Sequence, residues 1–172
     1  MEKIILTVCK GNIHRSVIAA ACINRVLIRR GMSKTFRVIS RGLQGSFGTA
    51  PPRRPSILDY PEEWALTAPA LHERNIEIPM NQTATPVSLS DVEGASVILA
   101  MDKYVLDEKP ESLMNQFPDH RLRMFLFMEL AGLSVDVPDC AGKRDLSAFS
   151  SVTEMIYSTV ENNFDVLLKR IG

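Results

Sequence analysis

The sequence predicts an α/β fold, a single doubly wound domain in which helices flank a four-stranded parallel sheet. Three observations predict it: short apolar runs rich in β-branched residues, amphipathic helical segments between them, and no repeat or low-complexity tract. Of the 172 residues, 45% are hydrophobic and 23% are charged, close to the globular average. We therefore expect one domain over residues 1–172.

The chain begins with a strand, a helix and a second strand. Residues 3–9 contain the run Ile-Ile-Leu-Thr-Val, which has no polar alternation and is typical of a parallel strand buried on both faces. An amphipathic helix over residues 16–30 follows and ends at Gly31. Residues 36–40 then predict the second strand, which completes a right-handed βαβ unit.

The middle of the chain is rich in residues that interrupt regular structure. Glycines and prolines predict a long loop at about residues 41–61, near the edge of the sheet. Two interpretations fit the segment after it. Either a helix starts around Thr67 and Pro69, or a helix that begins at Glu62 is kinked by Pro69.

The second half supplies the remaining strands and a closing helix. Residues 96–101 predict the third strand, and residues 122–127 the fourth, although helical spacing is an alternative for the fourth. A final amphipathic helix begins at about Ser150 and covers the sheet. Short helical turns are expected at three further places: residues 88–93, 103–108 and 112–116.

Charge and cysteine content limit the function classes. The 20 basic and 20 acidic residues cancel, which argues against nucleic-acid and membrane partners. The three cysteines, Cys9, Cys22 and Cys140, are irregularly spaced and indicate neither a disulfide framework nor a zinc site. The N-terminal apolar run is too short for a signal peptide. We expect a cytoplasmic protein, and no pattern indicates an oligomeric state.

The turn between the first strand and the first helix lies where open parallel sheets place their ligands. Its backbone N–H groups and the positive end of the helix favour a bound dianion, and Gly11 lets the backbone approach it. Arg15 can hold two oxygens of that anion through its planar guanidinium. The predicted phosphate-binding segment comprises Cys9, Lys10, Gly11, Asn12, Ile13, His14, Arg15 and Ser16.

The same surroundings predict that Cys9 is a nucleophile. A helix N-terminus and a guanidinium favour the thiolate form of a nearby cysteine. A thiolate at the floor of a phosphate site can attack phosphorus in line and form a cysteinyl phosphate, which water then hydrolyses. We expect Ser16 to donate its hydroxyl to the sulfur and Asn12 to brace the loop through its amide.

The pattern Cys-x5-Arg-Ser near the N-terminus, with Gly-Asn inside it, resembles the low-molecular-weight protein tyrosine phosphatase family. The resemblance covers nearly the whole chain and includes Ser40, residues 97–102 and residues 137–139. It implies a phosphomonoesterase, most closely a protein-tyrosine phosphatase, that needs no metal or organic cofactor. Its substrate would be a phosphorylated protein or a small phosphomonoester.

The resemblance also implies roles for residues outside the loop. Asp139 would be the general acid that protonates the leaving oxygen, a role that contributes roughly 10²–10⁴ in rate. Ser40 would donate or accept a hydrogen bond with Asn12, and Asp102 would shape the carboxyl edge of the sheet. Asp136 is the first rival for the acid, and Asp145 is another nearby carboxylate.

This chain departs from the family after the acid. Relatives have proline and then aromatic residues that wall the pocket, whereas Asp139 is followed here by Cys-Ala-Gly. Aromatic residues of the middle loop and its border are expected to substitute for that wall, and the candidates are Phe47, Tyr60 and Trp64. Cys140 itself is either an incidental thiol or a redox partner of Cys9, and Cys22 is expected to be a packed core thiol.

Three loop positions bear on specificity. Lys10 replaces an apolar or aromatic residue of the family and places a cation where acidic peptides could dock. His14 stands where many relatives carry a second cysteine, and it is expected to fill the loop or face solvent. Ile13 matches the tyrosine phosphatases, whereas phosphoarginine phosphatases have threonine there.

Other functions remain as alternatives on the same fold. Thioredoxin-coupled arsenate reductases share the loop but need two further cysteines near mid-chain, and none lies between Cys22 and Cys140. A small-molecule phosphatase is the second alternative within enzymes. The third is a non-catalytic phosphate- or phosphoprotein-binding module that keeps the loop without turnover.

Overall fold

The computed structural model describes residues 2–172 and is built on one sheet of four parallel strands in the order β2-β1-β3-β4. The strands are β1 (Lys3–Cys9), β2 (Phe36–Gly42), β3 (Ala95–Ala100) and β4 (Met124–Leu126). The chain starts in the interior of the sheet and extends it in both directions. This arrangement, with helices on both faces, confirms the predicted α/β fold class.

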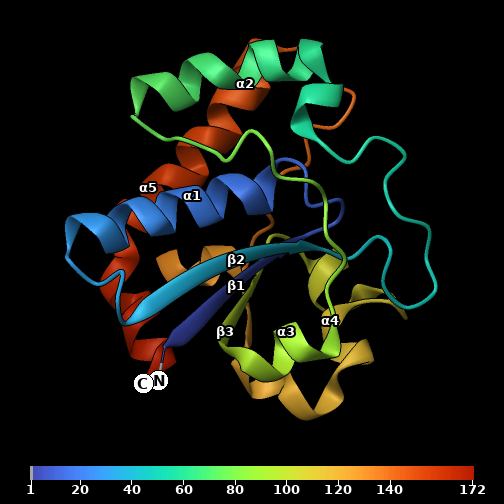
Figure 1. Cartoon of the computed structure of the whole chain (residues 1–172), viewed down its shortest axis with the longest axis vertical. Helices are drawn as coiled ribbons and strands as arrows, with labels where there is room; N and C mark the ends of the chain where they lie inside the picture. Colours follow the sequence, from blue (N-terminus) through green and yellow to red (C-terminus); the bar gives the residue numbers. More distant parts are fainter. Residues whose placement is uncertain (1) are drawn as a thin grey trace.

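Helices cover both faces of the sheet (Figure 1). One layer contains α1 (Arg15–Arg29), α2 (Pro61–Glu73) and α5 (Leu146–Ile171), and the other contains α3 (Leu89–Gly94) and α4 (Leu113–Gln116). Shorter helical turns complete the structure: η1 (Ile57–Asp59), η2 (Tyr104–Glu108), η3 (Pro118–Arg123) and η4 (Phe127–Ala131). Among residues 2–172, no helix has the length and apolar character of a membrane span.

The side chains of β1 alternate between the two layers. Ile5 and Cys9 belong to the apolar cluster formed with α1 and α5, whereas Leu6 and Val8 belong to the cluster on the α3 side. Thr7 donates a 2.8 Å hydrogen bond to the carbonyl of Ser16 in α1. Because both faces are buried, the strand needs no polar alternation. Cys9, its last residue, therefore lies on the α1 side at the carboxyl edge of the sheet.

The Gly/Pro-rich connection is shorter than the predicted 41–61. Arg41 and Gly42 are the last residues of β2, where Gly42 pairs with Cys9, and Pro61 is the first residue of α2. The remaining connection includes the single turn η1, which Ser56 caps by accepting a hydrogen bond from the Leu58 amide. Pairing with the adjacent β1 keeps Gly42 in the strand, although glycine alone predicts an interruption.

The bounds of α2, α5 and β4 can be compared with those that the sequence predicts. Pro69 lies inside α2, so of the two interpretations the one with an earlier helix start is confirmed. The last helix begins at Leu146, before the predicted Ser150, because the Asp145 side chain caps it by accepting the Ser147 N–H at 2.9 Å. The fourth strand is confirmed at Met124–Leu126, and the residues after it form η4.

Candidate active site

The turn from β1 to α1 places backbone groups around the sulfur of Cys9. The amide N–H of Asn12 donates to Cys9 Sγ at 3.2 Å, and Ser16 Oγ lies 3.1 Å from the same sulfur. Cys9 is 3% exposed, yet it lines a cavity that opens at the carboxyl edge of the sheet. Ser16 therefore lies within hydrogen-bond distance of the sulfur, as the sequence predicts, and either atom of this contact can be the donor.

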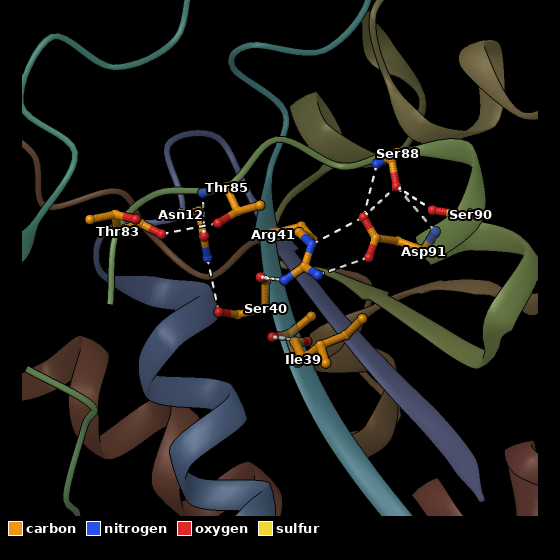
Figure 2. Close-up of polar contacts among 10 residues, drawn as sticks. Asn12, Ile39, Ser40, Arg41, Thr83, Thr85, Ser88, Ser90 and Asp91 are labelled. Carbon is orange, nitrogen blue, oxygen red and sulfur yellow. Dashed lines mark hydrogen bonds and ion pairs between the residues drawn. The ribbon is translucent and has the colours of Figure 1, made fainter. Parts of the chain in front are cut away.

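Asn12 gives the turn its shape. Its φ of 56° lies in the left-handed region, which non-glycine residues seldom adopt. The side-chain amide holds this conformation: Nδ2 donates to Ser16 Oγ at 3.1 Å and to Ser40 Oγ at 3.0 Å. The Oδ1 atom accepts the Thr85 N–H at 2.9 Å, so the loop is also tied to a distant segment (Figure 2).

The supports of Asn12 are themselves fixed. Ser40 also accepts a 3.1 Å hydrogen bond from Gln82, and Arg41 next to it forms a two-point ion pair with Asp91 at 2.9 and 3.0 Å (Figure 2). Partial burial opposes the charge of Asp91, but hydrogen bonds from Arg41 and Ser88 outweigh burial and lower its pKa. The carboxyl end of β2 is thereby tied to α3.

Gly42 permits the close contact between β2 and the turn. A Cβ atom at this position would lie 3.0 Å from both Asn12 Cβ and the carbonyl carbon of Gly11. Any side chain would therefore displace the loop. The local sequence does not reveal this requirement, since it depends on the position of a neighbouring strand.

Arg15, the first residue of α1, is buried and faces the cavity. Its Nη1 donates to Asp102 Oδ2 at 2.5 Å and to the Val137 carbonyl at 2.9 Å. Burial disfavours the cation, but the charges of Cys9, Asp139 and Asp102 outweigh burial and raise the pKa of Arg15. Because Nη1 makes both buried contacts, a bound anion would meet the Nε and Nη2 side of the guanidinium, where Nη2 also lies 3.4 Å from Asp139 Oδ2.

Asp139 lies at the same cavity and is half exposed. Its Oδ2 is 3.4 Å from Arg15 Nη2, and its Oδ1 accepts the Ala141 N–H at 3.0 Å. The rival carboxylates have other contacts: Asp136 accepts the backbone N–H of Lys103, and Asp145 caps α5. Neither lines the cavity, so among these three only Asp139 lies near Cys9.

A contact from α2 holds the segment after Asp139. Glu63 Oε1 accepts the N–H of Gly142 at 3.1 Å, and Glu63 also lines the cavity. Cys140 is buried between these positions and donates to the Ala148 carbonyl at 3.6 Å. Burial raises the pKa of the Cys140 thiol. All three cysteines are free, and Cys22 is a core thiol, as predicted, whose pKa burial raises to about 12.

The cavity has a volume of about 310 Å³ and an aromatic wall of a different origin from the family pattern. Tyr60, one of the three predicted substitutes, lines it, and so does Phe149 from the first turns of α5, which the sequence analysis missed. The other two candidates do not line it: Phe47 is 61% exposed elsewhere, and Trp64 packs against the core.

His14 is part of the wall, although it is predicted only to fill the loop or face solvent. Its Nε2 lies 3.1 Å from Thr67 Oγ1 in α2, and its ring meets Phe149 edge-on at 5.4 Å. Burial, and then the charge of Arg15, lower the pKa of His14 to about 4, with partial opposition from Asp139. His14 is therefore uncharged at neutral pH. Lys10 stays exposed, with its amine 5.2 Å from the Tyr104 ring.

The comparison with known families agrees with this arrangement. Residues 4–171 match the family described as Low molecular weight phosphotyrosine protein phosphatase, so the chain belongs to that family. It is a phosphatase of the hydrolase class, as the sequence predicts. A search of curated protein sequences gives no match.

Solved structures share the fold at low sequence identity. The low molecular weight protein tyrosine phosphatase from T. tengcongensis has a TM-score of 0.74 and 24% identity, over 96% of this chain and 99% of that one. The phosphotyrosine phosphatase from Vibrio cholerae O395 gives 0.73 and 20%, over 98% of each chain. The YwlE arginine phosphatase from Geobacillus stearothermophilus gives 0.69 and 18%, over 97% and 94%.

The depressed pKa of His14 predicts a pH dependence of stability. Between pH 6.5, its ordinary pKa, and about 4, the unfolded chain binds a proton at His14 that the folded chain does not. This difference lowers the free energy of unfolding as pH falls, by up to roughly 3 kcal/mol across the window. Urea unfolding of wild type and His14→Gln at several pH values should therefore give curves that converge as pH falls.

The exposed His72 supplies the matched control, since His72→Gln should keep the wild-type slope. Parallel curves for wild type and His14→Gln between pH 6.5 and 4.5 would contradict the lowered pKa of His14.

Proposed function

We propose that this phosphatase hydrolyses phosphotyrosine in proteins through a cysteinyl phosphate formed on Cys9. One observation carries the proposal. The Asn12 N–H and the Ser16 hydroxyl converge on Cys9 Sγ, at 3.2 and 3.1 Å, in the cavity that Arg15 and Asp139 also line. A nucleophile, an anion site and an acid therefore face one volume, as acid-assisted phosphoryl transfer requires.

In the first step, the phosphoryl oxygens bind the loop N–H groups, the N-terminus of α1 and the Nε and Nη2 side of the Arg15 guanidinium. The Cys9 thiolate attacks phosphorus opposite the ester oxygen. The S–P bond forms as the P–O bond breaks, and protonated Asp139 gives its proton to the departing oxygen. Its position at the cavity mouth, where it is half exposed, suits contact with a leaving group.

In the second step, water replaces the leaving group beside Asp139. The carboxylate takes a proton from water as the oxygen attacks phosphorus, and the S–P bond breaks to restore the Cys9 thiolate. Phosphate then leaves, and Asp139 is again protonated. The Ser16 hydroxyl and the Asn12 N–H stabilise the sulfur both as nucleophile and as leaving group. The scheme uses no metal or organic cofactor.

The cavity wall favours a phenol ring as the leaving group. Tyr60 and Phe149 line it, and aromatic pairs contribute about 0.5–1.5 kcal/mol beyond area burial. Ile13, also on the wall, keeps an apolar side chain in the loop. We expect a higher kcat/KM for a phosphotyrosine peptide than for the matched phosphoarginine peptide, and the reverse order would contradict this substrate assignment.

We place the protein in the cytoplasm on chemical grounds. The mechanism needs Cys9 as a thiolate, and all three cysteines are free thiols in the fold. A reducing compartment keeps such thiols reduced.

Replacing the nucleophile tests the covalent mechanism. Cys9→Ser should lower kcat for an activated aryl phosphate by roughly 10³-fold or more, because a hydroxyl is a far weaker nucleophile than a thiolate. Steady-state hydrolysis measures this loss. Cys140→Ser is the matched control, because it also lines the cavity and serine can keep the hydrogen bond to Ala148. Turnover that survives in Cys9→Ser would exclude the covalent mechanism.

The acid is tested through the leaving group. In Asp139→Asn, the rate of the first-turnover burst should fall by roughly 10²-fold or more for an aryl phosphate whose phenol is a poor leaving group. The burst rate for an aryl phosphate with an activated phenol should change little. Rapid-mixing measurements with a series of aryl phosphates give this dependence. Asp136→Asn, which can still accept the Lys103 N–H, should match wild type. Equal losses for all leaving groups in Asp139→Asn would remove Asp139 from this role.

A further inference from the structure

The catalytic cavity continues into a second, larger hollow. This neighbour has a volume of about 520 Å³ and shares Tyr60, Glu63 and Ala141 with the first. It lies between the N-terminal turn of α2 and the segment that follows the acid, since Pro61 and Lys143 also line it. A substrate whose phosphorylated ring occupies the first cavity would extend into the second.

Basic side chains dominate the border of these two hollows, here called the basic rim: Lys10, Arg53, Arg54, Lys143 and Arg144. The opposing carboxylates, apart from the acid Asp139, are Glu62 and Glu63. The whole chain has a formal net charge of zero, so this local excess of positive charge is a property of the site and not of the surface at large.

The pairing of these groups leaves cations available. Glu63 is occupied by the Gly142 N–H, and Glu62 lies 3.8 Å from Arg144 in a pair that is exposed on both sides. Within residues 2–172, neither Arg53 nor Lys143 makes a side-chain hydrogen bond or ion pair. Two cations, one at each hollow, thus face solvent beside the site of reaction.

Arg54 and Tyr60 give the rim a fixed part. The Arg54 guanidinium lies 5.2 Å from the centre of the Tyr60 ring, and it donates to the Asp59 carbonyl at 3.1 Å. The Tyr60 hydroxyl in turn donates to the Arg54 carbonyl at 3.2 Å. The aromatic residue at the junction of the hollows is therefore held beside a positive charge.

We propose that the second hollow and the basic rim bind acidic residues flanking the phosphotyrosine, so that acidic phosphopeptides are the preferred substrate class. The inference rests on the proposed function and adds its substrate specificity. Arg53 and Lys143 are the specificity-determining residues, because among residues 2–172 neither side chain has a hydrogen-bond or ion-pair partner, and neither lies over an aromatic ring as Lys10 lies over Tyr104. Charge complementarity at a solvent-exposed rim selects between partners more than it adds raw affinity.

The test uses three phosphotyrosine peptides that are identical except for glutamate, glutamine or lysine at the flanking positions. Wild type should show kcat/KM in the order glutamate, glutamine, lysine, mainly through KM, because the rim contacts substrate and transition state alike. In the double variant Arg53→Gln and Lys143→Gln, the ratio of kcat/KM for the glutamate peptide to that for the glutamine peptide should fall by about 3- to 10-fold. Added salt should reduce the preference in wild type.

The controls separate this proposal from the one on which it rests. The single variant Lys143→Gln, whose side chain lines only the second hollow, should hydrolyse a small aryl phosphate at the wild-type rate. Lys34→Gln with Lys169→Gln removes two exposed charges outside the cavities and should keep the preference. The reversed rim, Arg53→Glu with Lys143→Glu, should favour the lysine peptide.

Two results would overturn the inference: equal kcat/KM for the three peptides in wild type, or a preference that the double variant retains in full. Absence of aryl phosphate turnover in wild type would instead reject the phosphatase mechanism, so the two failures are distinguishable.

Discussion

The site depends on the burial of one cation, Arg15, at the point where the first helix begins. Its guanidinium contacts Asp102 just beyond β3, the Val137 carbonyl, and Asp139. These contacts join the turn between β1 and α1, the edge of the sheet and the segment around Asp139 through one charge. Removal of a buried charge from its partner is costly, so Asp102 and Arg15 fix each other's positions. The charges of Cys9, Asp139 and Asp102 outweigh burial and raise the pKa of Arg15, which favours the cation in this position.

A second constraint acts on the backbone of the loop. Asn12 adopts a left-handed conformation, and its N–H points to Cys9 Sγ only because its side chain is held from several directions. Ser16 and Ser40 accept from its Nδ2, and the Thr85 N–H donates to its Oδ1. The strained residue thereby orients a donor toward the sulfur, which is a common use of backbone strain in functional sites.

The sequence predicts most of the fold and the centre of the site because those features are local. Apolar runs without polar alternation identify the strands. Cys9, Gly11 and Arg15 lie close together in sequence, between the first strand and the first helix, so their proposed chemistry can be inferred from that position. The missed features depend on tertiary contacts. Thr85 contacts Asn12 across 73 residues of sequence, and Gln82 contacts Ser40 across 42 residues. Phe149 lines the cavity only because α5 packs beside it. For α2, the sequence left two helix starts open, because the local preference of Pro69 does not select the earlier start that the structure has.

A helix distant in sequence holds the segment after Asp139. Cys-Ala-Gly follows Asp139, and Glu63 of α2 accepts the N–H of Gly142. The covalent step on Cys9 is the central claim, and rapid acid quenching during the first turnover tests it most directly. Peptide mass analysis of wild type quenched with an aryl phosphate should find phosphate on the peptide that contains Cys9. Turnover without phosphate on that peptide, or with phosphate on another residue, would contradict the account.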